Sequence, residues 1–235
     1  MKRGLVAAFA ALLASLALQG TAAAQMEDDM QVPPRDWISP EHFVLEVRGG
    51  PYNPNLEGTG AFDDYYGDDD GPLLAVELDV IGYRLDDILY LGGGGGIGTA
   101  AFSGKTLDMT GEPTSEETSF DVLPLQLMAV VRIDALARKL KVPFIFTGKL
   151  GYEWAHWSTD SGGRNDADGW SVGLTWAAQV ALDLDFFEPS AARRMDEEWG
   201  INHTFLFFEV YGLEPSSQSL PLSGTQWAIG LGFTF

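Results

Sequence analysis

Residues 227–235 read WAIGLGFTF, and a large apolar residue stands at every second position of this stretch. These residues are Trp227, Ile229, Leu231, Phe233 and Phe235, and small or polar residues stand between them. Because successive side chains of a β-strand point to opposite faces, this alternation predicts a strand with one apolar face.

The same alternation recurs upstream and predicts six further strands, and the glycine segment 88–102 is counted as another. In one of them, Leu123, Leu125 and Leu127 alternate with Pro124 and Gln126. Most of these segments reach or exceed the ~9–11 residues that a tilted strand needs to cross a bilayer, and eight is the smallest strand number of transmembrane barrels. The expected fold class is all-β: an eight-stranded antiparallel up-and-down transmembrane β-barrel. Its predicted strands are 43–50, 73–82, 88–102, 119–133, 143–157, 170–183, 203–213 and 225–235.

The predicted connections between strands alternate in length, which independently favours an outer-membrane barrel. Long polar segments, expected as outer loops, are 52–71, 103–118, 158–169 and 214–224. The connections on the other side are shorter, except 184–202. That segment contains SAARRMDEEW and predicts one short periplasmic helix around Ala191 to Trp199, begun by Pro189 and Ser190.

The amino-terminal sequence indicates export. Lys2 and Arg3 precede an apolar run from Leu5 to Leu18, and small residues follow at 21–24. This pattern predicts a cleaved signal peptide over residues 1–24. Residues 25–41 are then expected to form an extended periplasmic segment without a site, and residues 42–235 to form the barrel.

Charge and cysteine content exclude several classes of partner and site. The formal net charge of −20 argues against nucleic acid as a partner. The chain has no cysteine, so disulfides and thiolate metal sites are excluded. Acidic residues gather in the predicted outer loops, as at Asp63, Asp64 and 68–70. This run fails the EF-hand spacing, and weak Mg²⁺ or Ca²⁺ exchange at a lipopolysaccharide surface is the hypothesis for these loops.

The run LGGGGGIGTA at 91–100 contains the spacing G-x-G-x-x-G of dinucleotide-binding loops. That fingerprint must open a helix, whereas Thr99 to Phe102 continue as a predicted strand. No cofactor is therefore expected. We interpret the glycines as a small-residue wall that leaves room for large inward side chains of neighbouring strands, with Gly94 and Gly96 as its critical positions.

The polar faces of the predicted strands are expected to fill the barrel interior, which in an eight-stranded barrel leaves no wide channel. An ion pair between Arg48 and Glu77 is expected across adjacent strands. A structural polar core is the favoured interpretation, and a narrow ion path is the alternative. The predicted lumen cluster is Glu46, Arg48, Glu77, Asp79, Gln126, Arg132, Lys149, Glu153, Gln179 and Glu209, with Asp183 and Tyr211 on the same faces.

Histidine, serine and aromatic residues stand near the ends of several predicted strands. His156 and Ser158 share one face at a predicted outer rim, where a lipid-modifying enzyme could use such a pair. His42 and His203 stand at strand starts and are expected to be interface residues rather than ligands. Aromatic residues near strand ends are expected to form membrane girdles; these are Tyr83, Tyr90, Trp154, Trp157, Trp170, Tyr211 and Trp227.

The stretch 227–235 also resembles the carboxyl-terminal signal of bacterial outer-membrane β-barrels. In that signal a final aromatic residue and alternating apolar residues are read by the barrel-assembly machinery. The resemblance carries over to Trp227, Ile229, Leu231, Phe233 and Phe235.

With its size and segment order, the chain as a whole resembles small barrels of the OmpA/OmpX type. More narrowly, LPLQLMAVVRID, EPSAARRMDEEWGINHTFLFFE and FDDYYGDDDG are similar to an uncharacterised myxobacterial barrel family. The narrower resemblance offers no established activity to carry over. The expected protein is a non-catalytic component of the Gram-negative cell envelope, in contact with outer-membrane lipid and lipopolysaccharide, with a structural or surface-interaction role. A narrow, porin-like diffusion channel and a lipid A-modifying enzyme are the alternatives.

Overall fold

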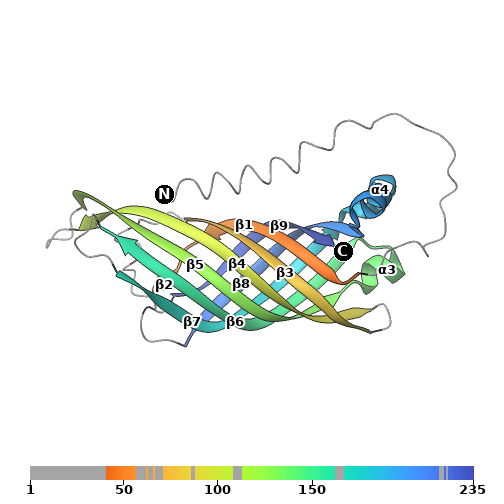
Figure 1. Ribbon diagram of the computed structural model, residues 1–235, viewed down its shortest axis with the longest axis horizontal. Coiled ribbons are helices and arrows are strands. Elements are labelled where there is room, and N and C mark those ends of the chain that lie inside the picture. Colours follow the sequence, from red (N-terminus) through yellow and green to blue (C-terminus); the bar gives the residue numbers. More distant parts are fainter. Residues whose placement is uncertain are drawn as a thin grey trace. The chain divides into compact units, whose positions relative to one another are not determined.

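The computed structural model describes residues 41–56, 62, 66, 71–85, 88–107, 113–161, 167–216, 220 and 222–235. Its long strands form one antiparallel sheet in which chain neighbours pair, and β1 (Phe43–Tyr52) also pairs with β9 (Leu222–Thr234) to close the sheet (Figure 1). The predicted eight-stranded up-and-down barrel is confirmed. The remaining long strands are β3 (Gly71–Leu85), β4 (Leu89–Leu107), β5 (Pro113–Ile133), β6 (Phe144–Asp160), β7 (Ala167–Asp183) and β8 (His203–Pro215). A two-residue strand, β2 (Asn55–Leu56), pairs with β9. The predicted signal peptide lies outside the described residues.

The two ends of the barrel differ in what they carry. The helix end carries the start of β1, the carboxyl terminus and the helices, and the loop end is the opposite one (Figure 1). At the loop end the strands run further than predicted: β5 has 21 residues and β4 has 19. Much of the segment 103–118, expected to be a loop, is therefore paired strand, and the same holds for parts of 158–169 and 214–224. Polar residues continue the ladder because backbone pairing does not require apolar side chains.

The helix end carries two short helices. The predicted one is confirmed as α4 (Pro189–Trp199): proline occupies its first turn, and Gly200 ends it in the left-handed conformation with φ 68°. The other, α3 (Ala135–Leu140), was missed, because a six-residue helix carries too little periodicity to be recognised. A 3₁₀ turn, η2 (Leu184–Phe186), connects β7 to α4. No helix among the described residues is long and apolar enough to span a membrane.

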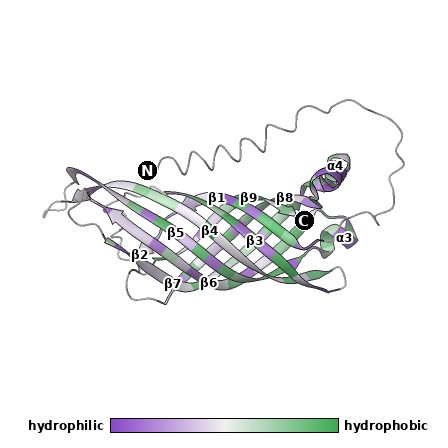
Figure 2. Ribbon diagram, in the orientation of Figure 1, coloured by the Kyte–Doolittle hydropathy of each residue, from purple (hydrophilic) through white to green (hydrophobic). Residues whose placement is uncertain are grey.

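Strand parity separates apolar outward residues from inward ones, and hydrophobic residues are densest in the half of the barrel near α3 and α4 (Figure 2). Among the aromatic residues expected to form girdles, Tyr83, Trp154, Trp170 and Trp227 are exposed on the outside. The prediction was wrong for the other three. Tyr90 and Tyr211 are buried inside the barrel, and Trp157 packs against the interior aromatic cluster.

The glycine run lies in β4, and every second glycine faces the interior. A Cβ atom on Gly94 would stand 1.8 Å from Oδ1 of Asp79, and one on Gly96 would stand 3.3 Å from Oε1 of Gln126. Gly95 points outward, where the nearest atom to an added Cβ is the Gln126 carbonyl oxygen at 3.6 Å. The inward glycines therefore make room for polar side chains of β3 and β5, as the small-residue wall requires.

Gly94→Val should destabilise the barrel by about 1–3 kcal/mol, the range for overpacking a filled interior. The added side chain would displace Asp79 within the buried charged layer. Urea unfolding, followed by tryptophan fluorescence and by heat-modifiable gel mobility, measures the effect. Gly95→Val is the matched control, because it adds the same side chain on the outward face. Equal stability of the two variants would contradict the packing role of Gly94.

Candidate functional site

The middle of the barrel interior is a layer of buried ionisable and amide side chains. The sequence-predicted residues Glu46, Arg48, Glu77, Asp79, Arg132, Lys149, Glu153, Gln179 and Glu209 are all buried there, and Gln126 is half-buried. They come from β1, β3, β5, β6, β7 and β8, so the layer ties together strands that do not pair with each other. We call this set the charged layer.

Lys149 lies at the centre of the charged layer and contacts three carboxylates. Its Nζ is 2.6 Å from Oε2 of Glu46, 2.8 Å from Oε1 of Glu77 and 3.4 Å from Oε2 of Glu209. Arg48 pairs with Glu209 through the same guanidinium nitrogen that is 3.3 Å from Glu77. The predicted Arg48–Glu77 ion pair is therefore present, and two cations share the acids of β1, β3 and β8.

Amide side chains and a third cation complete the network. Arg48 donates to Oε1 of Gln126 at 2.7 Å, and Gln126 donates to Oε2 of Glu153 at 2.6 Å. Gln179 donates to Glu46 at 3.1 Å, and Arg132 lies 3.3 Å from Oε1 of the same glutamate. These hydrogen bonds and ion pairs offset the cost of burial, because an unpaired ion inside a barrel wall carries a desolvation cost of several kcal/mol.

Apolar layers lie on both sides of the charged layer. Towards the loop end, Tyr52, Phe102, Phe120 and Tyr211 join a buried cluster, and Phe62 from the first loop packs 4.8 Å from the Phe102 ring centroid. Towards the helix end, a second cluster contains Val44, Ile145, Ala181, Phe205 and Phe207. A cavity between Arg48, Tyr52 and Glu153 measures about 10 Å³, room for about one water molecule. The lumen is filled by side chains.

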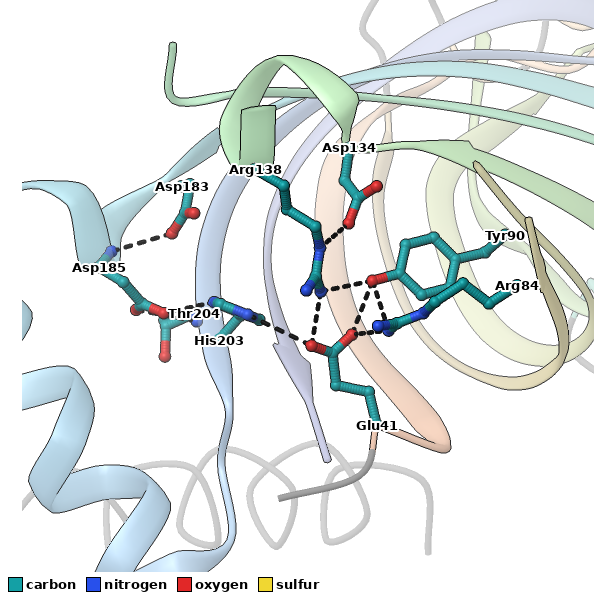
Figure 3. Close-up of polar contacts among 9 residues, drawn as sticks. All are labelled: Glu41, Arg84, Tyr90, Asp134, Arg138, Asp183, Asp185, His203 and Thr204. Atoms are coloured by element: carbon teal, nitrogen blue, oxygen red, sulfur yellow. Dashed lines mark hydrogen bonds and ion pairs between the residues drawn. The ribbon is translucent and has the colours of Figure 1, made fainter. Parts of the chain in front are cut away.

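The helix end of the barrel carries a second polar cluster, centred on Glu41 (Figure 3). Its carboxylate lies 2.5 Å from Arg84 and 2.5 Å from Arg138, accepts a hydrogen bond from the Tyr90 hydroxyl at 2.7 Å, and is 3.4 Å from Nε2 of His203. Residues 25–41 were expected to form an extended segment without a site, so no role was predicted for Glu41. One acid just before a strand gives no periodic signal, so sequence patterns could not reveal it.

The charge around Glu41 determines its protonation. Burial alone would raise the pKa of this carboxyl, but hydrogen bonds and positive charge from His203 and Arg138 outweigh burial and hold the pKa well below its usual range. Glu41 is therefore ionised across the physiological pH range, and it ties the chain just before β1 to β3, β4, α3 and β8.

His203 extends this cluster towards α4. Its Nδ1 is 2.7 Å from Oδ2 of Asp185, while Nε2 faces Glu41. Asp185 also accepts a hydrogen bond from the Thr204 backbone N–H at 3.2 Å, and its own N–H donates to Asp183 at 3.1 Å. His203 was expected to be an interface residue rather than a ligand, and its two ring nitrogens face carboxylates from two different segments, Asp185 and Glu41. The second histidine, His42, lies exposed just before β1.

Two groups of described residues have donor atoms close enough for a metal ion. They are Asp183, Asp185 and His203, and Glu46, Glu77 and Asp79, with ligand atoms within 4.8 Å of one another in each group. A cation already neutralises the second group, because Lys149 contacts Glu46 and Glu77. In the first, the His203 imidazole lies between Asp185 and Glu41. Protein side chains of positive or titratable charge thus already contact acids of both groups.

Other predicted candidates lie at the loop end. His156 and Ser158 are half-buried on β6, and Nε2 of His156 is 3.8 Å from Oδ2 of Asp168 on β7. Ser158 pairs in register with that same Asp168. The acidic run at Asp63, Asp64 and 68–70 lies outside the described residues, so cation exchange there remains a hypothesis.

Comparisons with known proteins concern the fold. No protein-family model matches the chain, and none of the curated proteins compared with it matches. Similar solved structures include Ail, the attachment invasion locus protein of Yersinia pestis, in complex with the heparin analogue sucrose octasulfate: 11% identity, 83% of this chain and 97% of that chain covered, TM-score 0.47. Neisserial surface protein A has 12% identity, the same coverages and a TM-score of 0.46. The N-terminal β-barrel domain of Pseudomonas aeruginosa OprF has 9% identity, coverages of 83% and 100%, and a TM-score of 0.42. These are small outer-membrane barrels, and at such identities no activity follows for this chain.

Lys149→Met should lower the free energy of unfolding by about 3–5 kcal/mol, the range for breaking a buried ion pair from one side. The substitution keeps much of the side-chain volume but leaves Glu46, Glu77 and Glu209 without their shared cation. Urea titration of the refolded barrel in detergent measures the change. Lys139→Met on the exposed part of α3 is the control. A Lys149 variant as stable as the Lys139 variant would refute the network.

Glu41→Gln should cost about 1.5–3 kcal/mol at pH 7, the range for hydrogen bonds to a charged group. Because the folded-state pKa of Glu41 lies below the unfolded value of about 4.3, the advantage of the wild type is complete above that pH. It should shrink as the pH falls below about 4. Unfolding titrations between pH 3 and pH 7 test this, with Glu198→Gln on α4 as the exposed control. A pH-independent difference would contradict the ionised Glu41 anchor.

Proposed function

We propose that this chain is an integral protein of the outer membrane in a Gram-negative cell envelope, with a structural or surface-interaction role and no catalytic activity. The observation that carries the proposal is the belt of exposed apolar side chains around the barrel. Large exposed apolar surfaces on a folded protein mark a contact with lipid or with another apolar partner. Here the belt encircles a closed sheet, the arrangement that lets backbone polar groups cross a bilayer.

The dimensions of the belt support a membrane location. On β5 the outward positions are apolar from Leu123 to Ile133, and on β6 they are apolar or glycine from Phe144 to Trp154. Both stretches match the ~9–11 residues of a transmembrane strand. Beyond them, outward residues become polar, as at Glu117 and Asp160. Trp154 and Trp170 lie at this boundary, where aromatic rings favour the lipid headgroups.

The filled interior supports a structural role over conduction. Ions crossing the lumen would have to pass the charged layer and both apolar clusters, and eight strands leave no wider path. The enzyme alternative has weaker support. At 3.8 Å the His156–Asp168 contact is longer than the ~2.6–3.2 Å that holds a catalytic histidine in place, and the Asp168 side chain is 77% exposed.

In this proposal the helix end faces the periplasm and the loop end faces outward. The exposed strand extensions of β4 to β7 would then present polar backbone ladders to the cell exterior. Lipopolysaccharide would meet the acidic loop end through weakly held divalent cations, and the barrel-assembly machinery would read the alternation from Trp227 to Phe235. The leading residues 1–24 would direct export and be removed.

The expressed protein should fractionate with outer membranes, run with heat-modifiable mobility, and give no ohmic steps in planar bilayers. Full recovery in the soluble periplasm would refute the membrane location. Ohmic steps that are lost or altered in Arg48→Ala would instead establish the channel alternative, because Arg48 lies in the layer that an ion path must cross. A refolded wide porin serves as the positive control for conductance.

A further inference from the structure

A second apolar surface lies outside the barrel wall at the helix end. Phe186, Phe187 and Trp199 have exposed fractions of 52%, 62% and 54%, and they come from η2, the residue after it and the last residue of α4. The two phenylalanine rings pack edge to face, with centroids 5.6 Å apart. Burial of such side chains is worth ~1.5–3 kcal/mol each, so their exposure to water needs a physical reason.

The position of this surface connects it to the apolar belt. Leu182 and Leu206 are paired outward residues at the helix-end edge of β7 and β8. Phe186 and Phe187 follow shortly after Leu182 in the chain. In Figure 1, α4 lies beyond the outline of the barrel wall, whereas α3 lies at its mouth. Phe186 and Phe187 therefore lie next to the helix-end edge of the belt, where a surrounding lipid leaflet would end, and Trp199 follows at the far end of α4.

Contacts with the barrel hold this segment in place. Asp185 binds His203 and the Thr204 backbone N–H, and Asp183 accepts from the Asp185 backbone. Sδ of Met195 lies 3.9 Å from the Thr204 hydroxyl, which keeps α4 against β8. The segment that carries the exposed rings is thus attached at both of its ends.

Charges of both signs lie near the surface. Arg193 and Arg194 lie on α4, which also carries Asp196, Glu197 and Glu198, and Lys139 and Lys141 lie at the end of α3. Among the described residues, none of these four basic residues has an ion pair with another side chain. Basic residues beside aromatic ones are the composition of segments that rest in a membrane interface, where the rings enter the acyl boundary and the cations meet phosphates.

We propose that Phe186, Phe187 and Trp199 form an interfacial anchor that inserts into the periplasm-facing phospholipid leaflet. This inference rests on the proposed membrane location. The His203–Asp185 contact then has a role: it sets the height of the anchor relative to the belt. The anchor fixes the depth of the barrel in the bilayer and resists tilting, which a belt of apolar residues alone does not.

The absence of cysteine allows a direct test, because a single introduced thiol can be spin-labelled without side reactions. Phe187→Cys and Trp199→Cys, reconstituted in vesicles of phosphatidylethanolamine and phosphatidylglycerol, are compared with Leu206→Cys in the belt and Glu197→Cys on the exposed part of α4. Power saturation in oxygen and in a water-soluble nickel chelate reports lipid or water around each label. Heat-modifiable mobility verifies that each variant is folded.

At positions 187 and 199, the oxygen-to-nickel accessibility ratio should be several-fold higher than at position 197 and should approach that at position 206. Ratios at 187 and 199 equal to that at 197, with a lipid-like ratio at 206, would overturn the anchor and leave the membrane location intact. A water-like ratio at 206 as well would overturn the proposed membrane location itself.

Discussion

Two buried cations shared among three glutamates hold the interior of this barrel together. Lys149 on β6 and Arg48 on β1 bind Glu46, Glu77 and Glu209, which come from β1, β3 and β8. Backbone pairing joins only neighbouring strands, whereas the contacts of Lys149 and the Arg48–Glu209 pair join strands that are not paired. Because these side chains are buried, with exposed fractions of 4% or less, the ion pairs lose little strength to screening, and each partner becomes costly to remove.

The charged layer explains the surrounding architecture. Its side chains need space, and the inward glycines of β4 provide it, as the close approach of Asp79 to Gly94 shows. The side chains of the charged layer are also separated from solvent by apolar clusters. The aromatic cluster with Phe62 and Phe102 lies towards the loop end, and the cluster with Phe205 and Phe207 lies towards the helix end. A barrel packed in this way is held together by its interior side chains as well as by its backbone pairing.

At the helix end, the Glu41 cluster connects distant parts of the chain through ionic contacts, as the charged layer does in the middle of the barrel. It joins the chain before β1 to Arg84, Arg138 and His203, and His203 continues through Asp185 to the turn that carries Phe186. The mouth of the barrel, the position of α3 and the attachment of α4 therefore share one set of ionic contacts. The ionic cluster at the barrel mouth and the exposed aromatic segment thus both depend on groups that are far apart in sequence.

The sequence by itself determined the strand number, the up-and-down order, the helix from Pro189 and the side chains that face inward from most strands. These follow from local rules, since a strand places alternate residues on opposite faces and a helix begins and ends at recognisable residues. The alternation of apolar and polar residues could not assign faces in β4, because glycines stand on both faces of that strand. Tyr90 was therefore not assigned to the interior. Only the tertiary structure decided the height of each residue along the barrel axis and its partner across the lumen. Those depend on the tilt and stagger at which eight strands close, and no period within a single strand encodes them. That is why the Arg48–Glu77 pair of adjacent strands could be predicted, whereas the meeting of Lys149 with Glu46 and the convergence on Glu41 could not.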